Sequence, residues 1–314
     1  MPIPSLLPAR QRTPAPILPV PLVSIFLNRR SEGTRRAYAT DLSDFARFTG
    51  ATSNSEALAS FTHLEAGQAN MLALQYRQFL VSSGKSPATI NRRLATLRSA
   101  SKLARSIGAI NWTLEVENEP ARSYRDTTRP GLDGFRALLQ NAEAHHTAAK
   151  AARDIAILRL LFDLALRRKE VVGIDLADID FRTGQIQICG KGSRERIGLT
   201  IPEPTRQALL NWIQHRGSEA GPLFTNFDRA GKGNRLTGAA VYYIVRGLGR
   251  MAGIETRPHG LRHAAITEAL DLMQGDVRSV QKFSRHRNLE TLTIYDDNRR
   301  DIASDVANLV ADSV

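Results

Sequence analysis

The sequence has a single cysteine, Cys189, among 314 residues. One thiol cannot form an internal disulfide or a metal site built from several thiolates, so both are excluded. Long hydrophobic runs are also missing, because no stretch approaches the roughly 20 apolar residues that cross a bilayer. The hydrophobic content of 42% is enough for ordinary globular cores. Together these features predict a cytoplasmic protein that does not span a membrane.

A cleavable signal peptide is not recognisable at the N-terminus. Residues 1–21 hold seven of the 14 prolines, which interrupt any apolar stretch, and no small-residue cleavage site follows them. Proline restricts the backbone and favours extended polyproline conformations. We therefore interpret residues 1–21 as a flexible, proline-rich arm.

Acidic residues are scarce relative to basic ones. The chain has 43 Lys and Arg against 31 Asp and Glu, a formal net charge of +12 and a pI near 10.4. Residues 1–105 hold most of the excess, with 14 basic and five acidic side chains. Such a balance indicates an anionic partner, nucleic acid or a membrane surface, with a well-solvated surface as the alternative interpretation.

The first third of the chain has the apolar spacing of helices. Patterns with apolar residues three or four apart occupy residues 31–50, 69–86 and 86–110. In the last of these, Ile90 and Leu94 fall on one face, and Arg92 and Arg93 belong to the opposite, basic face, which suits contact with phosphates. Residues 106–130 lack a clear period and contain two prolines, so we predict a linker there.

The period changes in the second half of the chain. Helical patterns are followed, in residues 173–202, by short segments in which Ile186 and Ile188 alternate with glutamines. Such alternation predicts strands, and the turns RTG and GKGSRE between them predict an antiparallel meander. Helical patterns then resume, and residues 301–314 form one more amphipathic helix.

These patterns predict a mainly α fold, in which an N-terminal helical domain precedes an α+β domain with a small antiparallel three-stranded sheet. The predicted organisation is an arm (1–21), a helical domain (22–105), a linker (106–130), an α+β domain (131–300) and a C-terminal helix (301–314). We expect the C-terminal helix to dock on a neighbouring subunit. No internal repeat is apparent.

Two basic residues, Arg167 and Lys191, stand out by their positions in the pattern. Arg167 follows a strongly apolar helix that ends at Leu166, and a buried arginine is rare unless it is paired. It either forms a salt bridge with Glu170, three residues on, or uses its planar fork to hold a phosphate. Lys191 lies at a glycine-flanked hairpin tip, where it either faces water or reaches into a groove to donate a proton.

Histidines are clustered late in the sequence. His259, Arg262 and His263 are spaced to share one side of a helix. A zinc site is disfavoured, because no third ligand is near and the arginine would repel the cation. Two histidines and an arginine directed at a phosphate explain this spacing better than a zinc site does. His286 follows, and nine residues later comes Tyr295, which by helical spacing alone would be a core residue.

These residues, in this order, resemble those of the tyrosine recombinase, or phage integrase, family of site-specific DNA recombinases. The first domain resembles the family's core-binding domain in two segments, GTRRAYATDLSDFARF and SPATINRRLATLRS. The second domain resembles the family's catalytic domain. The resemblance implies a nucleophile, Tyr295, and five assisting residues: Arg167, Lys191, His259, Arg262 and His286. It implies that Tyr295 forms a covalent 3′-phosphotyrosine, that the arginines stabilise the transition state, and that Lys191 protonates the departing 5′ oxygen.

Two departures from the family pattern are visible. The family usually has Thr-Gly-Leu before the first arginine, where this chain has Leu164, Ala165 and Leu166. It usually has Leu-Gly before the late histidine, where this chain has Ser284 and Arg285. Either departure could alter the local backbone or add a phosphate contact. Neither removes a reacting group, so we expect activity to be retained.

The resemblance also implies partners. Double-stranded DNA would be clamped between the two domains, with two protomers per core site and a tetramer in the synapse; a second, related recombinase as partner is left open. The scheme needs no metal, ATP or other cofactor. We expect DNA contacts from four arginines of the first domain: Arg35, Arg36, Arg92 and Arg93. The sequence does not specify the DNA site or the biological event, whether integration, excision, inversion or dimer resolution.

Three alternative functions remain open. A type IB topoisomerase would use similar chemistry to relax supercoils as a monomer, which the short length and the tail helix disfavour. A non-catalytic DNA-binding regulator on the same fold is disfavoured because all six groups are present. A metal-dependent nuclease would need a cluster of Asp and Glu, and none with suitable spacing is evident.

Overall fold

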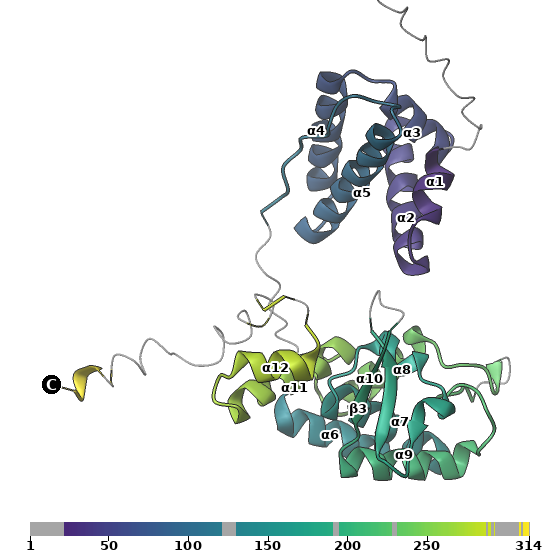
Figure 1. The fold of residues 1–314 in the computed structure, drawn as a ribbon, viewed down its shortest axis with the longest axis vertical. Helices are drawn as coiled ribbons and strands as arrows, with labels where there is room; N and C mark the ends of the chain where they lie inside the picture. The colour runs from purple at the N-terminus through teal and green to yellow at the C-terminus, as the bar shows by residue number, and fades with distance from the viewer. Residues whose placement is uncertain are drawn as a thin grey trace, which may run out of the picture. The chain divides into compact units, whose positions relative to one another are not determined.

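In the computed structural model, the described residues are 22–120, 130–190, 195–227, 231–286, 288–289, 292, 308 and 310–313. The chain divides into two compact units, residues 1–122 and 123–314 (Figure 1). Helices predominate, and the second unit contains a three-stranded antiparallel sheet, which confirms the predicted fold class. The predicted domain boundaries stay a prediction, and the arm lies outside the described residues. No helix among those residues is long and apolar enough to cross a membrane.

The first unit consists of helices whose ends are set by local sequence. They are α1 (Leu22–Asn28), α2 (Glu32–Thr49), α3 (Asn54–Thr62), α4 (Ala66–Ser82) and α5 (Pro87–Ser106). Ser53 and Ser86 accept hydrogen bonds from the N–H groups of Glu56 and Thr89, which caps α3 and α5. Gly50, with φ 74°, ends α2 in the left-handed conformation that glycine adopts without strain.

Aromatic rings fill the centre of this unit. Phe45 is buried and meets Phe61 and Tyr76 edge-on, at centroid distances of 5.5 and 5.1 Å. Trp112 meets Phe61 edge-on at 5.7 Å and donates from Nε1 to a backbone carbonyl of the unit. Ring pairs of this geometry stabilise a core beyond their buried area. Residues 110–116 therefore belong to the packing of this unit, although they lie in the stretch predicted to be a linker.

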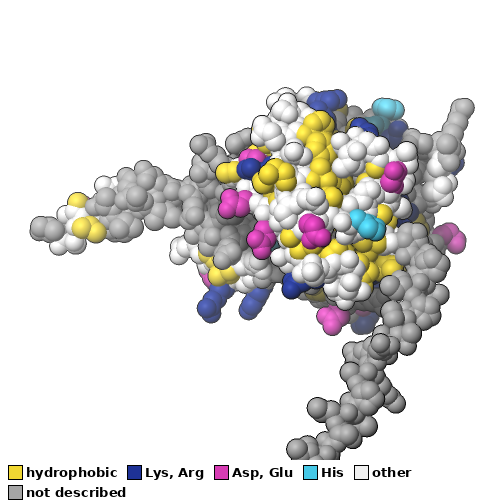
Figure 2. All heavy atoms as spheres, turned by 90° about the horizontal axis from the view of Figure 1, so that it is seen from above, with side chains coloured by type: hydrophobic (Ala, Val, Ile, Leu, Met, Phe, Trp, Pro, Cys, Tyr) yellow, Lys and Arg dark blue, Asp and Glu magenta, His cyan; other side chains and the backbone are white. Residues whose placement is uncertain are grey.

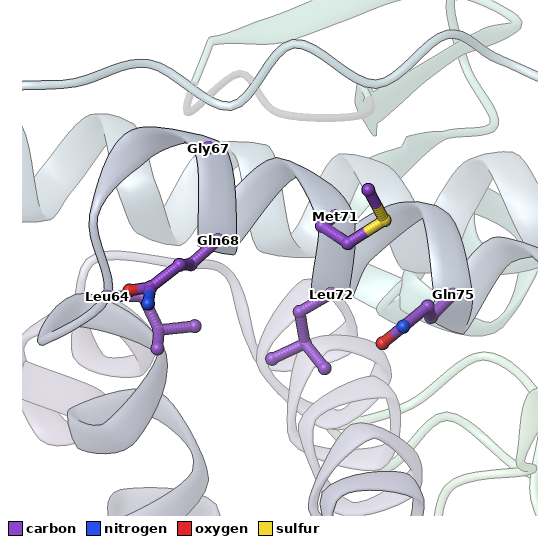
Figure 3. A pocket seen from close by; sticks show the side chains of 6 residues that line it. All are labelled: Leu64, Gly67, Gln68, Met71, Leu72 and Gln75. Atoms are coloured by element: carbon purple, nitrogen blue, oxygen red, sulfur yellow. The ribbon is translucent and has the colours of Figure 1, made fainter.

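The exposed side of α4 carries large apolar side chains, Met71, Leu74 and Phe79, among glutamines. Figure 2 shows hydrophobic side chains in patches on the face of the molecule seen from above, with acidic side chains among them. A shallow groove beside α4 (Figure 3) is lined by Leu64, Gly67, Gln68, Met71, Leu72 and Gln75. Its lining is aliphatic and amide, and none of the residues predicted to act on phosphate belongs to it.

The helices of the second unit surround a buried helix, α7. They are α6 (Gly131–Glu143), α7 (Ala148–Asp163), α8 (Arg168–Gly173), α9 (Glu203–Arg216), α10 (Gly238–Met251), α11 (Pro258–Leu272) and α12 (Val277–Ser284), with a 3-10 turn η1 (Leu176–Asp178). Ile157, Leu158, Leu160 and Leu161 of α7 have no accessible surface. Because adjacent residues point to different sides of a helix, α7 is enclosed, and α6, α9 and α11 pack against it.

A small sheet completes the second unit. Its strands β1 (Ile179–Asp180), β2 (Gln185–Cys189) and β3 (Arg196–Thr200) pair antiparallel in the order β1-β2-β3. Ile186 and Ile188 of β2 are buried and Gln187 between them is exposed, because side chains alternate along a strand. Ile188 pairs with Ile197 of β3, and the connection between these strands includes residues 191–194, outside the described residues.

Candidate active site

The turn after α7 leads to the first predicted catalytic residue. α7 ends at Asp163, and Ala165 takes a left-handed conformation with φ 44°. Leu166 then returns to the core with no accessible surface, and its N–H donates to the carbonyl of Leu160. Arg167, the N-cap residue of α8, follows this turn and keeps 29% of its side chain accessible.

Arg167 is held by the carboxylate of Glu170. Its backbone N–H and its Nη1 each donate to one oxygen of that carboxylate at 2.8 Å, and Glu170 itself is buried. The Nη2 of Arg167 donates to the carbonyl of Arg285 at 3.3 Å. The salt bridge expected as the plain structural alternative therefore exists, and the same contacts fix the direction of the guanidinium.

Arg262 lies buried one helical turn after His259. Both residues belong to the start of α11, where His259 is exposed and Arg262 is only 2% accessible. The Arg262 guanidinium donates to the carbonyls of Ala165 and Ser284. Its Nη2 lies 3.5 Å from Nε2 of His286. Arg262 therefore joins the turn after α7 to the end of α12.

His286 lies in the turn that follows α12, which ends at Ser284. Ser284 has no accessible surface, and Arg285 takes a left-handed φ of 56° before the chain reaches His286. This turn presents two consecutive carbonyls, which accept hydrogen bonds from Arg262 and Arg167. Three predicted catalytic residues from three separate elements are therefore gathered at one point.

Positive charge dominates this cluster. The pKa of His286 is lowered to about 4, first by burial and then by the surrounding cations, of which Arg262 and Arg167 contribute most. His286 is therefore a neutral imidazole at neutral pH. Within the described residues, the guanidiniums of Arg167, Arg262 and Arg285 meet at the turns after α7 and α12, beside one buried carboxylate, that of Glu170. Such an excess of fixed positive charge is suited to an anion.

Two of the six predicted catalytic residues, Lys191 and Tyr295, lie outside the described residues. On the approach to Tyr295, Leu292 is fully buried in an apolar cluster that includes Ala165 and Ile266. Leu292, three residues before the predicted nucleophile, therefore shares an apolar cluster with residues of α11 and of the turn after α7. The roles assigned to all six residues stay predictions.

The four arginines predicted to contact DNA lie on helices of the first unit. Arg35 and Arg36 are exposed on α2. On α5, Arg92 keeps 43% of its side chain accessible, whereas Arg93 keeps 11%. Solvent therefore reaches the first three much more readily than Arg93, and contact with DNA stays a prediction for all four.

Arg92 and Arg93 are ion-paired with buried acids of α2. Asp41 accepts from Arg92, and Asp44 lies 2.5 Å from Nη1 of Arg93. Asp44 also accepts from the hydroxyl of Tyr76 at 2.8 Å, and burial together with this hydrogen bond raises the pKa of Tyr76. The interpretation of α5 as a basic face does not include these acids. Their signal in the sequence is two carboxylates three residues apart, each next to an apolar position of α2.

The structure offers no metal centre in the part of the chain that it describes. No group of three or more His, Cys, Asp or Glu side chains there could hold a metal ion. The rings of His259 and His263 lie 6.5 Å apart and nearly perpendicular. Arg262 lies between them in the sequence, and its positive charge would disfavour a cation nearby.

Comparisons with known proteins match this chain to the phage integrase family and to tyrosine recombinases. The sequence profile of the phage integrase family matches residues 133–301. A tyrosine recombinase of Synechocystis sp. is 39% identical over 297 residues, which cover 93% of this chain and 94% of that protein. A tyrosine recombinase of Synechococcus elongatus is 40% identical and covers 90% of each chain. The tyrosine recombinase XerC of Corynebacterium glutamicum is 31% identical over 70% of this chain and 71% of its own length.

Solved structures share the fold. A XerH site-specific recombinase bound to a palindromic difH substrate, in a post-cleavage complex, has a TM-score of 0.62 at 19% identity and covers 83% of this chain and 75% of its own. A lambda integrase dimer bound to a COC′ core site has a TM-score of 0.60 at 15% identity, with 88% and 77% covered. At these identities the likeness concerns the fold alone.

Proposed function

Because the chain belongs to the phage integrase family of tyrosine recombinases, we propose that it is a site-specific DNA recombinase that cuts and rejoins strands through a covalent 3′-phosphotyrosine. The nucleophile is Tyr295, and the assisting residues are Arg167, Lys191, His259, Arg262 and His286. The observation that supports this most is the meeting of Arg167, Arg262 and His286 in a cluster with an excess of positive charge.

A phosphodiester has the chemistry that this cluster would bind. It presents two non-bridging oxygens and one negative charge, which would offset part of the positive excess. Arg167, directed by Glu170, and Arg262, directed by backbone carbonyls, would each donate to these oxygens. Charge on the oxygens increases in the transition state, so guanidiniums that are already in place stabilise that state more than the bound substrate.

The proposed reaction forms a bond between phosphorus and the Tyr295 oxygen and breaks the bond between phosphorus and a 5′ oxygen of DNA. His259 accepts the phenolic proton, and Lys191 gives a proton to the leaving oxygen. His286, neutral because its pKa is low, donates a hydrogen bond to the phosphate. The 5′-hydroxyl of another strand reverses the step and joins new partners, and the phosphotyrosine conserves the bond energy, so ATP is not required.

The proposed substrate is duplex DNA, held by residues 22–105 as a core-binding domain and residues 131–300 as a catalytic domain. The proposed assembly has two protomers on each core site and four in the synapse, with the C-terminal helix docked on a neighbouring subunit. The names of the fold neighbours support this, since one is a dimer on a core site and another is bound to a difH substrate. The basic first unit supports it electrostatically.

Covalent capture of DNA tests the proposal. The full chain is incubated with labelled fragments from the region flanking its own gene, with EDTA present, and the reaction is quenched in detergent. Because the 3′ end of the cut strand would be joined to the protein, a 5′-end label should migrate with the protein and a 3′-end label should not. Tyr295→Phe should bind the same DNA and give no adduct.

Two results would contradict the proposal. An adduct formed equally by Tyr295→Phe would mean that another residue is the nucleophile. Tight, site-specific binding by both proteins, with no adduct at a site that recombines in the cell, would favour the non-catalytic regulator.

A further inference from the structure

Two departures from the glycine-containing family pattern meet in this structure. Ala165 stands in the turn before Arg167, and Arg285 stands in the turn before His286. Both residues have positive φ, 44° and 56°, the region that glycine occupies without strain and other residues avoid. Strained backbone of this kind persists where surrounding contacts compensate for it. The compensating contacts at Arg285 come from its side chain.

The Arg285 guanidinium is turned into the protein. Its Nη2 donates to the carbonyls of Leu164 and Ala165 at 3.1 and 2.9 Å, and its Nη1 donates to the carbonyl of Phe283 at 2.8 Å. It also lies 3.5 Å from the Glu170 carboxylate, and only 11% of the side chain is accessible. These contacts direct Arg285 at the backbone of the turn after α7 and of α12 rather than toward an incoming phosphate.

The same two turns are also joined in the opposite direction. Arg167 donates to the carbonyl of Arg285 at 3.3 Å. Arg262 donates to one carbonyl of each turn, those of Ala165 and Ser284. Three guanidiniums therefore link the turn after α7 to the turn after α12. Loss of one leaves buried carbonyls with fewer donors and gives the two turns more freedom.

We propose that Arg285 is a positioning residue that fixes the Arg167 turn against the His286 turn, so that Arg167, Arg262 and His286 meet one phosphate. The proposal rests on the proposed function, in which that phosphate is the scissile one. A planar fork is suited to this, because Nη2 reaches carbonyls of the turn after α7 while Nη1 reaches the carbonyl of Phe283 in α12. Glycine at this position would relax the backbone and remove the link.

Arg285→Gly distinguishes the two roles. If the side chain were merely tolerated in place of glycine, the variant would form the covalent adduct as fast as wild type or faster. If the side chain positions Arg167, single-turnover adduct formation on 5′-labelled DNA should fall about ten- to a hundredfold, with little change in DNA affinity. Arg278→Gln removes an exposed arginine of α12 and should react as wild type. Arg285→Lys keeps the charge without the fork and should recover only part of the rate. If the glycine variant does not fold, the adduct-formation rate of Arg285→Lys is compared with that of wild type instead.

A double-mutant cycle separates positioning from general loosening of the fold. In an Arg167→Lys background there is no fork to position, so Arg285→Gly should cost much less than in the wild-type background. An equal cost in both backgrounds would overturn the proposal. Ala165→Gly keeps the carbonyls that Arg285 binds, so its rate should stay near that of wild type.

Phosphate binding without DNA keeps this proposal distinct from the proposed function. Inorganic phosphate is titrated into the full chain and followed by the ring resonances of His286, assigned with His286→Gln. Wild type and Arg278→Gln should bind phosphate equally, and Arg285→Gly about tenfold more weakly. Weaker phosphate binding by Arg285→Gly, with no adduct from any variant, would retain the positioning role and reject recombination. Unchanged phosphate affinity with an unchanged adduct rate would reject the positioning role alone.

Discussion

Both units of the molecule bury arginine beside carboxylate, but their balance of charge differs. In the first unit, Arg92 and Arg93 face Asp41 and Asp44, so these charges cancel. A further partner of Asp44, Arg47, is 79% exposed and is screened by water. In the second unit, three guanidiniums meet at the turns after α7 and α12 beside the one buried carboxylate found there in the described residues, and each guanidinium also donates to backbone carbonyls.

The difference separates two uses of the same residue type. In a balanced pair the two charges neutralise each other. Loss of the pair should therefore lower the free energy of unfolding of the unit that contains it. A cluster with excess positive charge is held together by neutral acceptors and keeps its attraction for an anion. The first arrangement therefore indicates a structural role and the second a role in binding and reaction. Each variant below tests one side of this contrast.

Arg262→Lys should have the largest effect. A lysine cannot donate to the carbonyls of Ala165 and Ser284 and to a phosphate at the same time, so the rate of adduct formation should fall about 10³-fold, roughly 4 kcal/mol of transition-state stabilisation. Single-turnover adduct formation on 5′-labelled DNA measures it. Arg93→Lys is the matched change in the balanced cluster, where one ion pair and the positive charge can be kept, and with DNA at saturating concentration its rate should stay close to wild type. Similar losses in the two variants would contradict the distinction between the clusters.

Much of the second cluster could be predicted from the sequence. Residue type and order assign Arg167, Arg262 and His286 to one set, and the helical period alone puts His259 one turn before Arg262. The left-handed turns could not be predicted, because the φ of a non-glycine residue such as Arg285 depends on tertiary contacts that no local pattern encodes. The departure from the family glycine marked the position without indicating where its side chain would point.

The first cluster was harder to predict. The helical period assigns Arg93 to a face of α5 but says nothing of Asp44, which lies 49 residues earlier in the sequence. The stretch read as a linker contains Trp112, Leu114 and Val116, which alternate and are all buried. That period of two indicates packed, extended chain, and a search for helical spacing does not find it.

Asp44→Asn should have the next largest effect, on stability. Arg93 is only 11% accessible and would lose its nearest carboxylate, keeping only Asp41, 4.0 Å from its Nε, so the first unit should lose about 3 kcal/mol of its free energy of unfolding. The two tryptophans separate the units, since Trp112 lies in the first and Trp212 in the second. Urea unfolding followed in a Trp212→Phe background reports the first unit, and unfolding in a Trp112→Phe background reports the second.

An exposed pair on the same helix supplies the control for Asp44→Asn. Glu32 pairs with Arg36, and 63% and 79% of the two side chains are accessible, so Glu32→Gln should change the stability by less than about 0.5 kcal/mol. An equal loss reported by Trp112 and Trp212 would mean that the Asp44 cluster supports the whole chain rather than one unit.

Burial, together with the positive excess, should also make the stability of the second unit depend on pH through His286. The pKa of His286 is about 4 in the folded protein and about 6.5 in an unfolded chain. Between these values the unfolded chain binds more protons, so the free energy of unfolding rises with pH from about 4 to about 6.5, and this group has no effect on the slope outside that window. The change should be on the order of 1 to 2 kcal/mol, because the ring is half-buried and partly screened.

His286→Gln removes the titrating group, so the difference between the two stability curves cancels the carboxylates that both proteins share. Followed by Trp212, wild type should lose more stability than the variant as the pH falls from about 6.5 to 4, and Trp112 should report no such difference. His63→Gln in the first unit is the matched control. Inorganic phosphate should narrow the difference, because an anion beside Arg167 and Arg262 raises the pKa of His286 toward its ordinary value. A flat difference curve would mean that neither burial nor the arginines lower the pKa of His286, and a difference that phosphate leaves unchanged would remove the electrostatic basis of the contrast between the two clusters.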